Sequence, residues 1–147
     1  PFEIGQFVRE IRSGDYDAFF RRLQSFFADT PYEVIAGQKP ERDTELHYRN
    51  VLFIVFKLVG LYTQVEYHTS QGRMGYHTSE GRVDLVLQTD RYIYVMEFKL
   101  NGTAEEALRQ IEERQYALPF ASDPRQVFKI GVNFSSVTRN IERWLVE

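Results

Sequence analysis

The chain has 147 residues, of which 43% are hydrophobic and 15% aromatic; its net charge is −3, and it contains no cysteine. This composition is typical of one folded domain with a substantial core, and it excludes a disordered chain, disulfides and thiolate metal sites. The weak negative charge excludes binding to nucleic acid or membrane by overall charge alone, and the longest apolar run, residues 51–56, is too short to span a bilayer.

The first predicted elements are two helices. Residues 4–12 are expected to form a short helix that ends near Ser13-Gly14, and Asp15 is the expected N-cap of the second helix. Apolar residues recur at helical spacing along this second helix: Tyr16, Phe19, Phe20, Leu23, Phe26 and Phe27. We therefore predict an N-terminal helical segment over residues 1–30 and a main domain over residues 31–147.

A third, central helix is predicted after the loop at residues 36–42. Asp43 or Thr44 is its expected N-cap, and Gly60 occupies the position that favours glycine after a helix. Its interior, VLFIVFKLV, is apolar on nearly all sides, so this helix is expected to be buried.

The second half of the chain is predicted to form a mixed sheet. Residues 64–68, 82–88 and 92–100 are rich in strand-forming side chains, and Thr89-Asp90 is the expected two-residue hairpin connection. A helix with Thr103 as N-cap follows, and its expected apolar stripe is Ala104, Ala107, Leu108, Ile111 and Leu118. The last predicted strand, residues 127–134, is apolar on both faces and is therefore expected inside the sheet, parallel to the strand before the helix.

A near repeat occupies residues 67–84. YHTSQGRMG is followed by YHTSEGRVD, and only the second copy ends in a carboxylate, Asp84, where the first has Gly75. The repeat is expected to lengthen a surface loop or hairpin before the strand at residue 82. His68 and His77 occupy equivalent places in the two copies and are expected to be loop or hairpin residues rather than metal ligands.

Asp84, Glu97 and Lys99 form the strongest chemical pattern. Glu97 and Lys99 share one strand face with Ile93 and Val95, and the expected hairpin register places Asp84 opposite Val95 and diagonal to Glu97. Two carboxylates and one ammonium on a patch of sheet are typical of sites for hard cations such as Mg²⁺. The alternative interpretation is a solvated Glu97–Lys99 ion pair at a strand end.

The succession GRVDLVL, then EFK starting thirteen positions after the aspartate, then the helix EEALRQIEERQY, resembles the PD-(D/E)XK nuclease superfamily. In particular, it is similar to a branch found at the C-terminal end of bacterial proteins with an AAA-ATPase-like N-terminal region. The likeness covers roughly residues 31–147. It implies an α/β fold with a restriction-endonuclease-like core, in the order helix, three strands, helix, strand.

The resemblance also implies an activity, namely Mg²⁺-dependent hydrolysis of phosphodiester bonds, with Mn²⁺ as an alternative metal and DNA as the expected substrate. Asp84 and Glu97 would bind the metal with help from the backbone carbonyl of Phe98. Lys99 would orient or polarise the attacking water and offset phosphate charge.

Glu45 and Gln110 receive supporting roles from the same resemblance. Glu45 would hold a metal-bound water or a second metal, and Gln110 would support the site from the helix. Ordinary roles stay open for both, as a first-turn helix carboxylate for Glu45 and a surface amide for Gln110. Arg82 either neutralises phosphate or has a structural role, such as an ion pair with Glu80.

The expected partners are nucleic acid and an ATPase domain in a longer parent chain, in the cytoplasm and without a membrane. The rival function is a catalytically silent domain that keeps the fold and binds nucleic acid or protein. The intact set of Asp84, Glu97 and Lys99 favours the enzyme. The negative net charge favours the silent domain, or a DNA-binding surface supplied by another domain or subunit.

Overall fold

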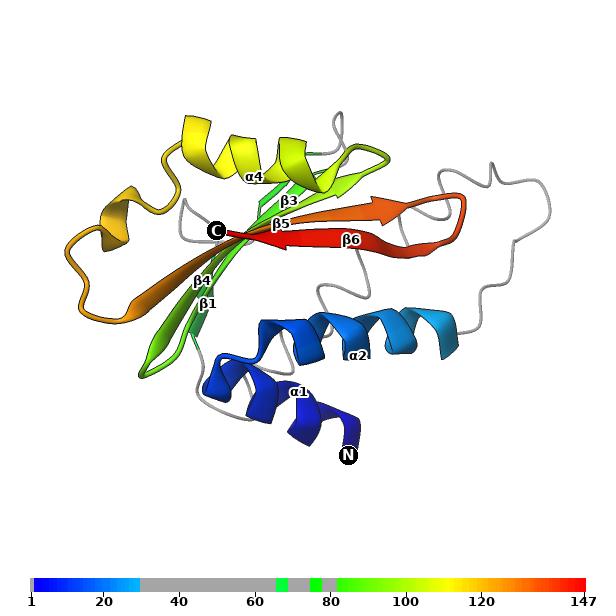
Figure 1. Ribbon diagram of the computed structural model, residues 1–147, viewed down its shortest axis with the longest axis horizontal. Coiled ribbons are helices and arrows are strands. Elements are labelled where there is room, and N and C mark those ends of the chain that lie inside the picture. The colour runs from blue at the N-terminus through cyan, green and yellow to red at the C-terminus, as the bar shows by residue number, and fades with distance from the viewer. Residues whose placement is uncertain (1, 30–65, 69–74, 78–81) are drawn as a thin grey trace.

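The computed structural model describes residues 2–29, 66–68, 75–77 and 82–147 (Figure 1). A mixed sheet lies between the helix pair α1 (Phe2–Ser13) and α2 (Tyr16–Asp29) on one side and α4 (Ala104–Glu113) on the other. The predicted fold class, an α/β restriction-endonuclease-like core with N-terminal helices, is therefore confirmed. The central helix expected near residues 43–60 lies outside the described residues.

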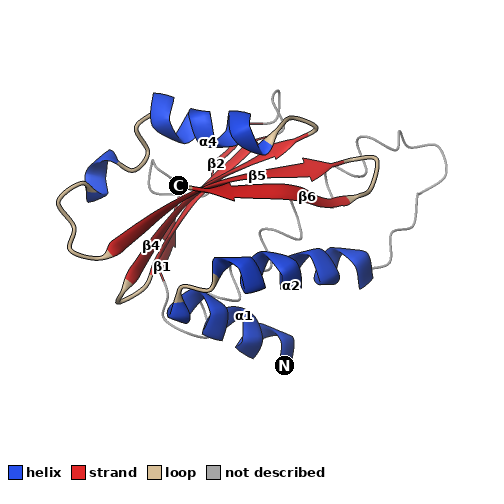
Figure 2. Ribbon diagram, viewed as in Figure 1, coloured by secondary structure: helices blue, strands red, loops and turns tan. Residues whose placement is uncertain are grey.

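The described strands form one six-stranded sheet in the order β1–β3–β4–β5–β6, with β2 also paired to β3 (Figure 2). Among the described strands, only the neighbours β4 and β5 are parallel, and α4 lies between them in the chain. The sequence predicts four of these strands but misses β2 and β6. The strands are β1 (Glu66–His68), β2 (Gly75–His77), β3 (Arg82–Gln88), β4 (Tyr92–Leu100), β5 (Gln126–Ser135) and β6 (Asn140–Val146).

The turn between α1 and α2 fits against the sheet. Asp15 Oδ1 accepts a hydrogen bond from Ala18 N at 3.2 Å, which confirms the predicted N-cap. Gly14 has φ +80°, and a Cβ there would lie 2.7 Å from the Tyr92 ring. Both the backbone conformation and the close contact therefore require glycine at this turn.

The two N-terminal helices share a core with the sheet. Phe19, Phe20, Leu23 and Phe27 of the predicted stripe on α2 are buried, and Tyr16 and Phe26 are partly buried against the same core. Tyr94 of β4, 0% exposed, donates a hydrogen bond from its hydroxyl to Ile11 O at 2.5 Å. Burial raises the pKa of the Tyr94 hydroxyl well above its usual range. The domain boundary at residues 30–31 stays a prediction.

Helix α4 begins as predicted but ends earlier. Thr103 Oγ1 accepts a hydrogen bond from Glu106 N at 3.0 Å, so Thr103 is the N-cap. The inclusion of Leu118 in the apolar stripe is wrong, because Leu118 is 61% exposed in the 3₁₀ turn η1 (Leu118–Phe120). Gln115 has a positive φ of 56°, which turns the chain out of the helix after Arg114.

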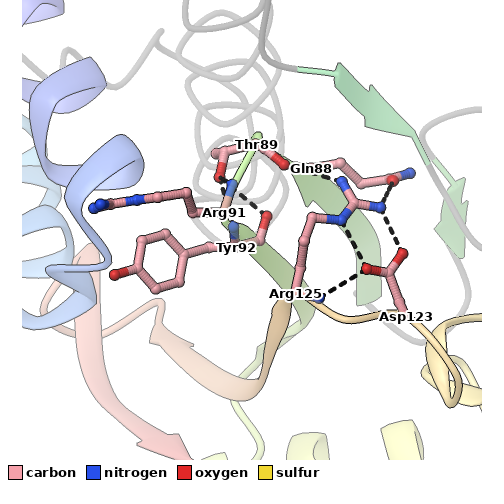
Figure 3. Close-up of polar contacts among 6 residues, drawn as sticks. All are labelled: Gln88, Thr89, Arg91, Tyr92, Asp123 and Arg125. Atoms are coloured by element: carbon pink, nitrogen blue, oxygen red, sulfur yellow. Dashed lines mark hydrogen bonds and ion pairs between the residues drawn. The ribbon is translucent and has the colours of Figure 1, made fainter.

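Arg125 ties the loop before β5 to the turn between β3 and β4 (Figure 3). Its guanidinium donates two hydrogen bonds to Asp123, at 2.9 and 2.7 Å, and one each to Thr89 O and Gln88 Oε1, both at 2.9 Å. The hydrogen bonds that the side chain and the backbone N of Arg125 donate to Asp123 lower the pKa of the Asp123 carboxyl to about 2.

We expect Asp123→Asn to make the fold less sensitive to acid. Because the pKa of Asp123 is lowered from 3.8 to about 2 on folding, its charged form contributes stability above the unfolded pKa. That contribution is lost as the pH falls through the folded pKa. Urea unfolding between about pH 5 and pH 2.5 should give a smaller loss of unfolding free energy in D123N than in the wild type. Equal losses in the two proteins would contradict the contribution of this ion pair.

Within the described ranges, no helix combines the length and the apolar character that crossing a membrane requires.

Candidate functional site

Asp84 and Glu97 lie directly opposite each other on β3 and β4. Opposed residues of antiparallel strands share one face, with Cβ atoms about 4.5–5.5 Å apart. Both residues are buried, at 4% and 0% exposure. Each has other interactions, but Oδ1 of Asp84 and Oε2 of Glu97 accept no hydrogen bond from the described part of the chain. The fold thus brings two buried carboxylates close enough to share a cation.

The expected pairing of Asp84 with Val95 is wrong by two residues. The turn is closed by Thr89 and Tyr92, because Thr89 N donates to Tyr92 O at 2.8 Å and Tyr92 N donates to Thr89 Oγ1 at 2.8 Å. The two connecting residues are therefore 90–91 rather than 89–90. This shift moves Glu97 from a diagonal position to one directly opposite the aspartate.

Both copies of the repeat contribute short strands that pair with β3. Gly75, the counterpart of Asp84 in the first copy, lies opposite Asp84 on β2. Since glycine has no side chain, the first copy adds backbone but no bulk beside the carboxylate. The repeat was expected to lengthen a loop or hairpin before β3, and it adds two short strands, β1 and β2, that pair with β3.

Lys99 lies two residues beyond Glu97 and shares its face of β4, whereas Phe98 between them is buried in the opposite core. Lys99 Nζ lies 3.2 Å from Oε2 of Glu106, near the start of α4. Because Glu97 is fully buried, the pattern is not a solvated ion pair at a strand end. The structure instead shows a buried carboxylate pair beside a lysine that is held from the helix.

The structure describes one of the two residues with a predicted supporting role, Gln110. Gln110 lies on α4 one turn beyond Glu106, and its Oε1 accepts a hydrogen bond from Arg114 Nε at 3.0 Å. Glu45 lies outside the described residues. The residues that the structure does describe contain no group of three or more His, Cys, Asp or Glu able to hold a metal. Two carboxylates still fit Mg²⁺, which usually keeps several waters.

Gly131 determines how closely α4 approaches this site. It lies beside Glu97 in the parallel register of β4 and β5, and a Cβ there would lie 2.4 Å from Ala104 O and 2.5 Å from Leu108 N. Only a glycine lets the helix backbone pack directly on the strand next to the buried carboxylate.

Sequence reasoning missed Gly131, Asn133 and Glu106 as neighbours of the site. The strand predicted over residues 127–134 is apolar on both faces, but a glycine and an amide interrupt it. That interruption is the signal that could have indicated a close helix contact and a buried polar group. Glu106 follows Thr103 at the spacing of a capping box, and that pattern does not indicate its contact with Lys99.

Residues 74–144, which include Asp84, Glu97 and Lys99, match the family model of the PD-(D/E)XK nuclease superfamily. These residues belong to that superfamily. The carboxylate pair and the lysine described above lie within the matched range. The resemblance inferred from the sequence is thus confirmed for the superfamily, while the ATPase-associated branch and the role of each residue stay predictions.

The chain is also similar to a protein of Azotobacter chroococcum mcd 1 that is described as an uncharacterized protein in the vnfD 5′ region. The two are 25% identical over 147 residues, which cover 99% of this chain and 27% of the relative. The chain thus spans about a quarter of that protein's length. No solved structure matches the chain.

Proposed function

We propose that the protein is a metal-dependent nuclease that hydrolyses phosphodiester bonds, with DNA as its substrate. The direct pairing of buried Asp84 and Glu97 within the superfamily's motif is the observation that carries this function. Like charges directly opposite in a sheet destabilise it, and burial strengthens the repulsion. A divalent cation held between the two carboxylates would offset that cost.

Each residue has a part in the proposed reaction. Asp84 and Glu97 would hold Mg²⁺ or Mn²⁺, with the backbone carbonyl of Phe98 as a further ligand. The bound metal would polarise a phosphoryl oxygen and acidify a water. Lys99, on the same face, would orient that water and balance phosphate charge with its compact ammonium. The supporting role of Gln110 belongs to the same proposal.

Glu45 completes the proposed set, as the residue that holds a metal-bound water or a second metal. Its carboxylate would add the third acidic group that the described residues do not provide. An ATPase domain in a longer parent chain and a cytoplasmic location also belong to this proposal.

The test is cleavage of supercoiled plasmid and labelled oligonucleotides with and without Mg²⁺. We expect Mg²⁺-dependent cleavage in the wild type and a loss of about 100-fold or more in Lys99→Ala, since electrostatic groups at such sites have effects of this size. Lys129→Ala is the matched control, because Lys129 also forms an ion pair with α4, to Glu112 at 2.6 Å, but lies farther from the carboxylates.

Equal cleavage by wild type and K99A would assign the activity to a contaminant and contradict the proposal. RNA oligonucleotides of the same sequence decide between DNA and RNA. The rival function, a silent domain that binds nucleic acid or protein, is favoured by the net charge of −3. Metal or DNA binding without any Mg²⁺-dependent cleavage would support that rival.

A further inference from the structure

Asn133 is a buried amide on β5, next to Lys99. It is 2% exposed, and its Cα pairs with that of Lys99 in the β4–β5 register. Its Oδ1 accepts a hydrogen bond from Gly102 N at 2.8 Å, and its Nδ2 donates to Glu142 Oε1 at 3.2 Å. Burying an amide is costly unless its polar atoms are bonded, and here both ends are. The amide therefore joins the loop before α4 to strand β6.

Gly102 packs against both Lys99 and Glu106. A Cβ on Gly102 would lie 3.1 Å from Cδ of Lys99 and 3.3 Å from Oε2 of Glu106. A side chain at residue 102 would thus crowd the lysine stem and the carboxylate that binds its ammonium, so the backbone of Gly102 lies close to both. The preceding residue is also fixed, because Asn101 N donates a hydrogen bond to Phe134 O at 2.8 Å.

The position of Lys99 therefore depends on contacts at both ends of its side chain. Glu106 holds the ammonium at 3.2 Å, and Gly102 limits the movement of the stem. A lysine has many rotamers, and fixing it before the reaction avoids an entropy cost during the reaction. A residue that holds the backbone of Gly102 in place therefore acts on the lysine without touching substrate.

We infer that Asn133 is a positioning residue for Lys99, acting through the backbone of Gly102; this role rests on the proposed nuclease function. The side-chain oxygen of Asn133 accepts from Gly102 N and its side-chain nitrogen donates to Glu142, so both ends of the amide are used within the protein and Asn133 acts on Lys99 through Gly102. Without the Asn133 side chain, the loop at residues 101–102 loses this hydrogen bond, and Lys99 can move away from the position that the reaction requires. The chemical step then slows, whereas DNA binding, which depends on other contacts, is retained.

The test compares Asn133→Ala with Asn140→Ala in steady-state cleavage at saturating Mg²⁺. Asn140 also uses both ends of its amide, donating to Gln24 O at 3.0 Å and accepting from Ile141 N at 2.7 Å, but it faces α2. We expect N133A to lower kcat by about 10-fold with KM changed less than about twofold, and N140A to keep kcat. An equal fall in kcat in both variants would overturn the role of Asn133 and indicate a general loss of stability.

A second readout needs no catalysis. In protein labelled with ¹³C-lysine, the Cε signal of Lys99, assigned with Lys99→Arg, reports the order of this side chain. We expect N133A to shift and narrow that signal and N140A to leave it unchanged; an unchanged Lys99 signal in N133A would overturn the inference. A shifted signal in a protein whose wild type does not cleave DNA would support the contact and reject the nuclease function.

Gly102→Ala tests the same contact if N133A does not fold. The added methyl group would press on the Lys99 stem directly, while the hydrogen bond to Asn133 can persist. We expect G102A to show the same shift of the Lys99 signal and the same fall in kcat. A folded G102A with wild-type kcat and an unchanged signal would overturn the inference.

Discussion

Asp84→Asn is expected to raise the stability of the metal-free protein and to abolish both metal-dependent stabilisation and cleavage. Asp84 and Glu97 are directly opposed and buried, so replacing one carboxylate with a neutral amide of similar shape removes a like-charge repulsion. The expected gain is about 1 kcal/mol, or a rise in Tm of ~3 °C for a chain of this size. The same change removes a metal ligand, so added metal no longer stabilises the fold.

Calorimetry with and without Mg²⁺ or Mn²⁺ measures both effects in one series. Glu113→Gln, at an exposed position on α4, is the control for a general effect of removing one negative charge. A metal-free D84N less stable than the wild type would contradict the repulsion. A metal-dependent rise in Tm that persists in D84N would exclude Asp84 as a ligand.

Gly131→Ala is expected to cause the largest loss of stability. The new Cβ would meet backbone atoms of α4, at 2.4 Å from Ala104 O and 2.5 Å from Leu108 N, and backbone cannot rotate away as a side chain can. The helix must move off the sheet, which we expect to cost about 3 kcal/mol and to lower Tm by ~10 °C. Cleavage should fall as well, because Glu106, which holds Lys99, moves with the helix.

Thermal unfolding of G131A beside Gly5→Ala provides the check. A Cβ at Gly5, on α1, would meet nothing within 4 Å. G5A is therefore expected to stabilise the protein by about 0.5–1 kcal/mol, as alanine does in place of glycine in a helix. A G131A protein as stable as the wild type would show that α4 does not pack on β5 at this distance.

The alternation of side chains along the strands was enough to predict which face of the sheet carries the candidate site. Because side chains alternate on a strand, Glu97 and Lys99 had to share one face, and the hairpin had to bring Asp84 beside them. The register was not predictable in this way, since it depends on Thr89, whose side chain accepts a hydrogen bond from Tyr92 N. A local side-chain bond, which leaves no periodic signal, thus decides how close the two carboxylates lie.

The neighbours of the site could not be predicted because their roles depend on tertiary contacts. Glu106 follows Thr103 at the spacing of a helix cap, and the sequence pattern does not show that its carboxylate reaches Lys99. Asn133 gains its role only when β5 lies parallel to β4 and the loop at Gly102 closes over it. Such contacts join segments that are far apart in the sequence, and the periodic pattern of apolar residues does not indicate which of these segments touch.

The arrangement of the hairpin and the crossover has a consequence for how the site assembles. Asp84 and Glu97 are thirteen positions apart on adjacent strands, whereas the Gly102–Asn133 hydrogen bond joins residues 31 apart. Short loops close at lower entropic cost than long ones, and the contact between Lys99 and Glu106, seven residues apart, is more local still. We therefore expect the acidic pair and the lysine to meet through local contacts, and the long-range hydrogen bond at Gly102 to be the last part of the site to form.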